Sequence, residues 1–436
     1  MTESLFGIGA LMVLLFARVP LAFAMAFIGF AGYYFLLGGN YNAAMAMTTR
    51  RIVDTAMEYN LSIVPLFILM GNFVNKAGLS DAIYRASNAF IGHFRGGQAM
   101  ATILACGGFS AISGSSLATA ATMAKVAMPQ MRQYGYDDSL ASASIAAGGT
   151  LGILIPPSII LVIYGIITEQ NIIDLFAAGL IPGILGVILY LLAVVYSVRR
   201  REGCTRSDKS SWYERWQSLL GVSHTMLLFF LVIGGIYAGW FTPTQAAAIG
   251  AFGAMILALA NRKLSWGDLR EVLIDSARTS CMLFSIIIAA LIFSNFVNRA
   301  GLPNALLGMI SAAELSPIMV IMLIIVIYFV LGCMLESMSM LLLTVPLFFP
   351  IVAGLGFDLV WFGVLVVVAI EISLITPPVG MNVFVLQGVL PDVTAGTIFR
   401  GIMPFLVADI IRILLIALIP GLSLWLPTLI NQWTGG

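Results

Sequence analysis

Long apolar stretches make up most of the chain, and polar residues interrupt them at only a few places. A helix needs roughly 20 mainly apolar residues to cross the hydrocarbon core of a membrane. The pattern therefore predicts an all-α membrane protein that crosses the lipid several times. The ranges expected to lie in lipid are 5–17, 21–37, 61–75, 139–168, 172–198, 219–240, 244–260, 279–297, 358–390 and 402–427.

Two further apolar ranges, 97–130 and 315–352, carry short polar motifs near their centres. The first contains Ser113-Gly114-Ser115-Ser116, and the second contains Glu336-Ser337-Met338-Ser339. We predict that each range is a re-entrant helical hairpin, which enters and leaves the membrane on one side. Two shorter amphipathic ranges, 80–95 and 263–278, are predicted to be helices that lie along the membrane surface.

Two of the predicted crossing helices are broken in matching ways. The first contains Gly148-Gly149-Thr150 and then Pro156-Pro157, and the second contains Thr376-Pro377-Pro378-Val379-Gly380. Proline lacks a backbone donor and leaves upstream carbonyl groups unpaired. Such a break at membrane depth is tolerated only where it is buried in protein or lines a cavity. Paired breaks in two halves of a chain point to a transporter's binding site.

The polar breaks belong to a longer internal similarity. Residues 72–79 reappear as 295–302 with Lys76 replaced by Arg299. One constant interval along the chain separates three pairs of positions, Pro156 and Pro377, Pro129 and Pro350, and Gly135 and Gly356. The sequence therefore predicts two structural repeats.

The positions of the basic residues predict how the chain is threaded. Cytoplasmic loops of membrane proteins carry an excess of Lys and Arg. With the N-terminus outside and both hairpins re-entrant, only Arg50, Arg51 and Arg299 fall outside, while Lys125 and Arg412 lie within spans. The two copies of the repeated motif then end on opposite sides, so the repeats are predicted to be inverted.

Composition excludes several classes of protein. The chain is 60% hydrophobic and 9% charged, whereas soluble domains carry about 25% charged residues. The net charge of +1 gives no indication of nucleic-acid binding. The N-terminus lacks the basic start and cleavage site of a signal peptide. The cysteines and histidines lie too far apart to predict a metal cluster; they are Cys106, Cys204, Cys281, Cys333, His93 and His224.

The residue types at the breaks suggest what they bind. Hydroxyl and carbonyl oxygen atoms, without sulfur or imidazole, suit a hard cation such as Na⁺. The N-terminal ends of half-helices favour an anion such as a carboxylate. The first candidate site consists of Ser113, Gly114, Ser115, Ser116, Thr119, Gly149, Thr150, Gly152 and Pro156. The second consists of Glu336, Ser337, Ser339, Thr376, Pro377, Gly380 and Asn382.

Each candidate also has a structural interpretation. Small residues such as 113–116 also allow helices to pack closely in membranes. Intramembrane carboxylates such as Glu336 and Glu371 are functional candidates, but an internal ion pair or a hydrogen bond to the backbone also explains them. Lys125 could extend to the membrane interface or form an ion pair.

Four motifs resemble the large membrane subunit of tripartite ATP-independent periplasmic (TRAP) transporters, in the ion transporter superfamily. They occupy 113–119, 152–158, 241–246 and 376–382, and the resemblance extends over nearly the whole chain. It implies an elevator mechanism, in which a transport domain slides against a scaffold. The implied scaffold parts are 1–95 and 219–312, the transport parts are 96–200 and 313–436, and a cytoplasmic linker covers 201–218.

The resemblance also implies partners and ligands. The expected partners are a small four-helix membrane subunit and a periplasmic substrate-binding protein, in a bacterial inner membrane. The expected substrate is an organic acid, such as a C4-dicarboxylate or sialic acid, carried with Na⁺ and without another cofactor. Carried over by motif, one Na⁺ site is lined by Ser113, Ser115, Ser116, Gly149 and Thr150, and the other by Glu336, Ser337, Thr376, Pro377 and Gly380.

Other functions remain as alternatives. A self-sufficient Na⁺/organic anion symporter of the same superfamily would need neither partner. An intramembrane enzyme would need a nucleophile and a base, and neither histidine lies in a break. A channel is disfavoured because paired hairpins that close on a central site suit alternating access. The sequence has no Gly-Lys-Ser/Thr loop, so this chain does not hydrolyse ATP to drive transport.

Overall fold

The protein is helical throughout the part of the chain that the structure describes. The computed structural model describes residues 2–199, 205–332 and 335–434, and these contain no β-strand. The all-α class predicted from the sequence is therefore confirmed. Cys204, Cys333 and residues 201–204 of the predicted linker lie outside the described residues.

Six of the described helices are long and apolar enough to cross a membrane. The chain is therefore a multi-pass membrane protein. These helices are α10 (Ile172–Arg199), α11 (Trp212–Tyr237), α12 (Pro243–Ala260), α13 (Trp266–Arg299), α16 (Ser337–Gly354) and α19 (Ala395–Leu418). A seventh candidate is a pair bent by 55°, made of α3 (Tyr41–Ala56) with η1 (Tyr59–Ser62) and α4 (Ile63–Lys76).

The N-terminal region matches the predicted spans except at α3. The apolar helices α1 (Thr2–Phe16), α2 (Leu21–Leu36) and α4 lie close to the predicted ranges, and α5 (Leu79–Ile91) is the predicted amphipathic helix. The helix α3 was not predicted. Polar residues such as Arg50 and Asp54, which form an exposed ion pair at 3.4 Å, obscure its apolar pattern.

Two predicted boundaries were wrong. The predicted surface helix 263–278 and the span 279–297 form one helix of 34 residues, α13. Ser265 and Asp268 cap its start with reciprocal hydrogen bonds, and its interior contains no proline to end it. The predicted span 402–427 is instead two helices, α19 and α20 (Gly421–Thr434), because Pro420 lies between them and has no amide to continue the helix. The short helix α14 (Leu302–Ala312) follows α13.

Both predicted hairpins are pairs of helices in contact with each other. The first consists of α6 (Gly97–Ser113) and α7 (Ser116–Gln133), and the second consists of α15 (Pro317–Gly332) and α16. The first polar motif forms the turn between α6 and α7, as predicted, whereas the second motif forms the cap and first turn of α16. Re-entry from one side remains a prediction, since α16 alone is long enough to cross a membrane.

Both predicted helix breaks are present. The first separates α8 (Asp138–Thr150) and η2 (Leu151–Ile153) from α9 (Ile159–Thr168). The second separates α17 (Leu359–Ser373) from α18 (Met381–Val389). The peptide bonds Pro156-Pro157 and Pro377-Pro378 are both cis.

The two halves also share local structure away from the prolines. The equivalent positions are separated by the same interval as the two Pro-Pro pairs. Asp137 accepts a hydrogen bond from the Leu140 amide at the start of α8, and Asp358 accepts one from the Trp361 amide at the start of α17, both at 2.9 Å. The two glycines identified from the sequence, 135 and 356, both adopt positive φ. Equivalent capping and turn geometry therefore accompanies the equivalent breaks.

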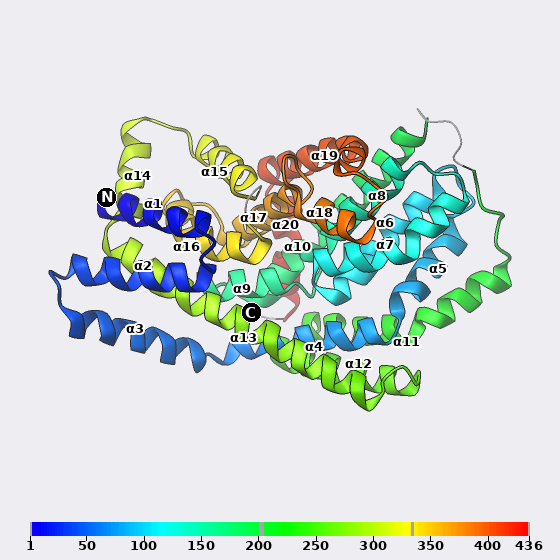
Figure 1. The fold of residues 1–436 in the computed structure, drawn as a ribbon, viewed down its shortest axis with the longest axis horizontal. Coiled ribbons are helices and arrows are strands. Elements are labelled where there is room, and N and C mark those ends of the chain that lie inside the picture. Colours follow the sequence, from blue (N-terminus) through cyan, green and yellow to red (C-terminus); the bar gives the residue numbers. More distant parts are fainter. Residues whose placement is uncertain (1, 200–204, 333–334, 435–436) are drawn as a thin grey trace.

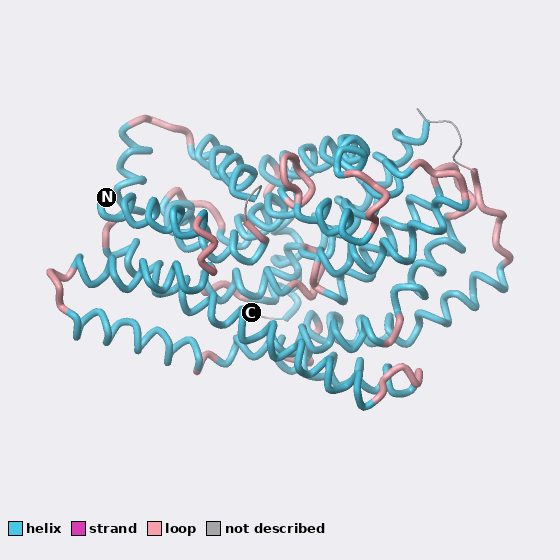
Figure 2. Tube along the Cα trace, viewed as in Figure 1, coloured by secondary structure: helices cyan, strands magenta, loops and turns pink. Residues whose placement is uncertain are grey.

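The helices form two groups along the long axis of the molecule (Figure 1). The long helix α13 contacts α2, α3 and α4, and α4 contacts α12. The hairpins and broken helices gather beside this framework, where α8 contacts α6, α7 and α19, and α17 contacts α10, α15 and α16. Figure 2 shows that short loops separate the helices. The division into scaffold and transport domains remains a prediction.

The contact between α2 and α13 generates a testable prediction. A Cβ added at Gly29 would lie 2.7 Å from the backbone nitrogen of Phe293. Gly29→Ala should therefore force the two helices apart and destabilise the fold by about 1–3 kcal/mol. Thermal unfolding of the purified protein in detergent measures this. Gly9→Ala is the control, because a Cβ there meets nothing within 4 Å, and equal stability of the two variants would contradict the prediction.

Candidate functional site

The turn of the first hairpin lies against the first helix break. Gly114 has a φ of +63°, which favours glycine. A Cβ built on Gly114 would lie 3.3 Å from the Ile159 side chain, at the start of α9, and 4.0 Å from the Pro157 carbonyl oxygen. The structure therefore places the Ser-Gly-Ser-Ser turn beside the Pro-Pro pair.

Two glycines that precede the first break let α8 and η2 approach the first hairpin closely. A Cβ at Gly149 would lie 3.2 Å from the carbonyl oxygen of Ser116, and one at Gly152 would lie 1.9 Å from the Cβ of Ser110. The helix α8 thus packs against both arms of the first hairpin. This close approach brings together the residues of the first candidate site.

The hydroxyl groups of this site have local hydrogen-bond partners and remain able to accept. Ser113 Oγ and Thr119 Oγ1 lie 2.9 Å apart, and Thr119 Oγ1 donates to the Ser115 carbonyl at 2.8 Å. Thr150, which is fully buried, donates its hydroxyl to the Ala147 carbonyl at 2.8 Å. Each hydroxyl oxygen keeps lone pairs, so these oxygen atoms could coordinate a hard cation.

Ser158 replaces part of the hydrogen bonding that the prolines remove. Its hydroxyl donates to the Ile153 carbonyl and accepts a hydrogen bond from the Leu161 amide at 3.2 Å. Ser158 therefore caps α9 and gives a partner to a carbonyl group upstream of Pro156. This residue belongs to a sequence motif identified above but was not among the predicted site residues.

Glu336 and Ser339 lie at the start of α16. The carboxylate of Glu336 accepts from the Ser339 amide at 3.3 Å and so caps its own helix, whereas Ser337 is buried. Glu336 and Ser339 line a cavity of about 270 Å³, whose other walls include Met12 of α1 and Leu21 of α2. The second hairpin turn therefore faces the N-terminal helices.

The second break also lies close to the second hairpin, through a contact between α17 and α15. Gly380 adopts a φ of +59° at the start of α18. Thr376 donates its hydroxyl to the Ile372 carbonyl at 2.6 Å. A Cβ at Gly332 would lie 2.1 Å from the Cβ of Ser373, so the ends of α15 and α17 touch. The hairpin and the break of this half therefore meet near the predicted residues.

Asn382 connects the second break to the helix that leads into the first break. Its amide Nδ2 donates to the Ala146 carbonyl of α8 at 3.1 Å, and its backbone amide donates to Leu374 across the second break. Its Oδ1 is buried without a hydrogen-bond partner. The helix α18 also contacts α7 and α8. The structure therefore places part of the second candidate site against the first.

Sequence reasoning missed a buried group of charges beside these breaks. Arg412 Nη2 lies 2.7 Å from Glu371 Oε2 and 2.9 Å from Asp409 Oδ1, and all three side chains are fully buried. The internal ion pair that was an alternative explanation for Glu371 is present. The spacing of Asp409 and Arg412, three residues apart in an apolar helix, was the available signal.

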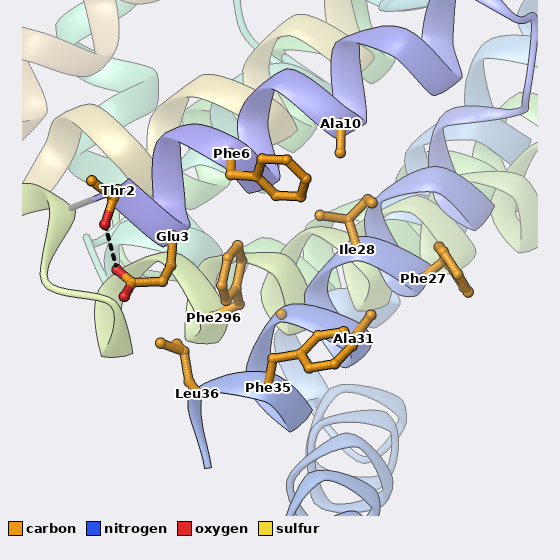
Figure 3. Close-up of a pocket in the computed structure, with 12 residues that line it drawn as sticks. Thr2, Glu3, Phe6, Ala10, Phe27, Ile28, Ala31, Phe35, Leu36 and Phe296 are labelled. Atoms are coloured by element: carbon orange, nitrogen blue, oxygen red, sulfur yellow. Dashed lines mark hydrogen bonds between the residues drawn. The ribbon is translucent and has the colours of Figure 1, made fainter. Parts of the chain in front are cut away.

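A separate cavity of about 840 Å³ lies between α1 and α2 (Figure 3). Aromatic side chains dominate its walls, with Phe6, Phe27, Phe35 and Phe296 shown as sticks. Its polar atoms include the hydroxyl of Thr2, which donates to Glu3 at 3.3 Å. The predicted site residues are not among those that line it, and its apolar walls offer few partners to an organic acid.

Two broken helices packed in the interior of a multi-pass membrane protein point to a transporter. The fold is similar to that of the Alcanivorax borkumensis YdaH transporter, with a TM-score of 0.62, 14% identity, and coverage of 88% of this chain and 90% of that one. A model of the tripartite ATP-independent periplasmic transporter, DctM component, matches residues 8–422. The chain belongs to this family, as the large membrane subunit of a TRAP transporter.

Relatives with established names agree with this assignment. The C4-dicarboxylate TRAP transporter large permease protein DctM of Pseudomonas aeruginosa is 35% identical over 386 residues, which are 88% of this chain and 89% of that protein. The sialic acid TRAP transporter large permease protein SiaM of Vibrio cholerae is 33% identical over 98% of this chain and 99% of its own length. These relatives identify the chain as a transporter subunit and not an enzyme.

The contact between the breaks gives a second prediction. Asn382→Ala removes the hydrogen bond from α18 to the Ala146 carbonyl of α8, which contributes about 0.5–1.5 kcal/mol. Thermal unfolding should show this loss. Asn431→Ala is a matched control, because Asn431 makes an exposed hydrogen bond to Asp174. Equal unfolding temperatures would show that the link between α18 and α8 is unimportant for stability.

Proposed function

We propose that the chain is the large permease subunit of a Na⁺-coupled importer of an organic acid. The observation that carries the proposal is the contact between the first hairpin turn and the Pro-Pro break, which gathers hydroxyl and carbonyl oxygen atoms in the protein interior. Neutral oxygen ligands suit Na⁺. Because the sequence has no ATP-binding loop, a Na⁺ gradient would supply the energy.

The region of the first hairpin turn and the first break also favours an anionic substrate. The helix α7 begins at the first hairpin turn and α9 begins at the first break, and helix N-termini carry partial positive charge and free amide donors. A substrate carboxylate beside a bound Na⁺ would benefit from both. The second break would contribute through Thr376, Gly380 and Asn382, and Glu336 would act from the second hairpin.

The proposed substrate class is a small organic acid of the C4-dicarboxylate or sialic acid type. The relatives named above carry these substrates in their names. A further relative, the large permease protein UehC of Ruegeria pomeroyi, is named for ectoine and 5-hydroxyectoine. Carboxylate recognition at the helix N-termini is the chemistry that the proposal requires.

We also propose that the two halves are inverted repeats and that transport follows an elevator mechanism. Equivalent caps, turns and breaks at one constant interval support the repeat. In this proposal the hairpins and broken helices move together as the transport domain. The framework around α13 would remain as the scaffold.

The proposed assembly lies in the bacterial inner membrane. It contains a small four-helix membrane subunit and a periplasmic binding protein that delivers the substrate. The relatives' names as TRAP large permease proteins support the need for these partners. The alternative is a self-sufficient Na⁺/organic anion symporter.

Reconstitution in proteoliposomes tests this function. We expect uptake of an organic acid only when an inward Na⁺ gradient, the small subunit and the binding protein are all present. Uptake without the two partners would favour the self-sufficient symporter. Equal uptake with K⁺ in place of Na⁺ would overturn the proposed coupling ion.

A third prediction concerns the first cation site. Ser115→Ala and Thr150→Ala each remove one candidate oxygen ligand, so the Na⁺ concentration for half-maximal uptake should rise about tenfold, as expected for the loss of one contact to a charged group. Uptake at graded Na⁺ measures this effect.

Ser285→Ala is the matched control, because the Ser285 hydroxyl is exposed on α13 and bonds only to its own helix in the structure. Ser115 also caps α7, so thermal unfolding of Ser115→Ala should be recorded separately. Unchanged Na⁺ dependence in both site variants would remove these residues from the cation site.

A further inference from the structure

The buried group made of Glu371, Asp409 and Arg412 contains two acidic side chains and one basic side chain. Two carboxylates approach the same guanidinium nitrogen, Arg412 Nη2. The other two nitrogens, Nε and Nη1, and Glu371 Oε1 are buried without hydrogen-bond partners. With all three groups ionised, one negative charge remains in the interior of the protein.

A simple structural ion pair does not account for this arrangement. One carboxylate is enough to neutralise a buried arginine, and a further buried charge is costly unless it is compensated. Among the described residues, the charged or titratable groups that interact with the cluster are its own members and Tyr190 of α10. The excess negative charge is therefore neutralised either by a proton on one of the two carboxylates, since burial favours the neutral acid, or by a cation bound nearby.

The cluster is connected to the first helix break. The hydroxyl of Tyr190 donates to Asp409 Oδ2 at 2.7 Å and lies 3.4 Å from Thr150 Oγ1. The Tyr190 hydroxyl therefore lies between the Asp409 carboxylate and the Thr150 hydroxyl. The helix α17, which carries Glu371, contacts η2 at the start of the break. Both carboxylates are therefore carried by residues close to the break.

We propose that this leftover negative charge is the counter-charge for the Na⁺ bound at the first break. The inference rests on the proposed function. The candidate ligands there are hydroxyl and carbonyl groups without formal charge, so they do not neutralise a cation in a low-dielectric interior. An opposite charge at this short range is weakly screened inside a protein. Glu371 and Asp409 are therefore positioning residues for the cation, and Arg412 holds them in place.

The test measures Na⁺ binding directly, without partners or transport. A ligand that binds the folded state raises its unfolding temperature according to its concentration and affinity. The purified protein in detergent is heated at graded NaCl, with choline chloride keeping ionic strength constant. Glu371→Gln and Asp409→Asn should each need about tenfold more Na⁺ than the unsubstituted protein for the same stabilisation, since each removes the net charge.

Two variants separate charge from structure. Tyr190→Phe keeps the charge but removes the hydrogen bond to Asp409, so its Na⁺ dependence should stay within about twofold of the unsubstituted protein. Arg412→Lys keeps the positive charge and should behave in the same way. A loss of Na⁺ response in Tyr190→Phe equal to that in Glu371→Gln would show a structural role and overturn the proposal.

The exposed cluster of Arg132, Asp138 and Asp392 provides a matched control. It also joins one arginine to two carboxylates, but at the protein surface. Asp392→Asn should leave the Na⁺ response unchanged. If Glu371→Gln and Asp409→Asn also respond like the unsubstituted protein, the counter-charge is refuted.

The outcomes distinguish this inference from the proposed function. If the unsubstituted protein shows no specific stabilisation by Na⁺, the proposed Na⁺ site itself fails, and the inference fails with it. If the unsubstituted protein responds to Na⁺ and the carboxylate variants respond equally, only the inference fails. Should one carboxylate variant not fold, the other still decides the question.

Discussion

The need to satisfy backbone polar groups in an apolar interior governs this structure. Two crossing helices are broken at Pro-Pro pairs, and lipid offers no partners for the carbonyl groups that are released. The protein supplies a partner itself, as the Ser158 hydroxyl does for the Ile153 carbonyl. The Asn382 amide adds a hydrogen bond from α18 to α8 at Ala146. The hairpins and the close glycine contacts shield the remaining polar atoms. The oxygen atoms that make the breaks costly are also the ones that can hold a cation.

Much of the fold followed from the alternation of apolar and polar segments. Both breaks and the first hairpin turn were predictable, because Pro-Pro pairs and a Ser-Gly motif interrupt apolar stretches. Single prolines are less informative, since α10 and α19 each contain one without ending. The errors in helix boundaries occurred where the local composition did not reflect where a helix begins or ends. Polar residues obscured α3, the amphipathic start of α13 resembled a separate surface helix, and Pro420 divided a continuous apolar stretch. Local patterns do not show whether neighbouring segments join into one helix.

The candidate site was only partly predictable. Sequence motifs identified the residues at each turn and break, but their mutual approach depends on glycine contacts between distant helices, such as Gly152 with Ser110. The buried charges were harder to assign, because Glu371, Asp409 and Tyr190 come from three helices. The sequence pattern shows only that Arg412 is a charged residue within an apolar helix. Only the packing of these helices shows which carboxylates it meets.

The unbroken helix α13 contrasts with the interrupted helices beside it. Its 34 residues extend about 51 Å at 1.5 Å per residue, whereas the hydrocarbon layer is only about 30 Å thick. The helix must therefore incline strongly or project beyond the lipid. It contacts α2, α3, α4 and α16 along its length. Helices that move relative to α13 would slide along one continuous helix, which has no internal break at which it could bend to absorb the motion.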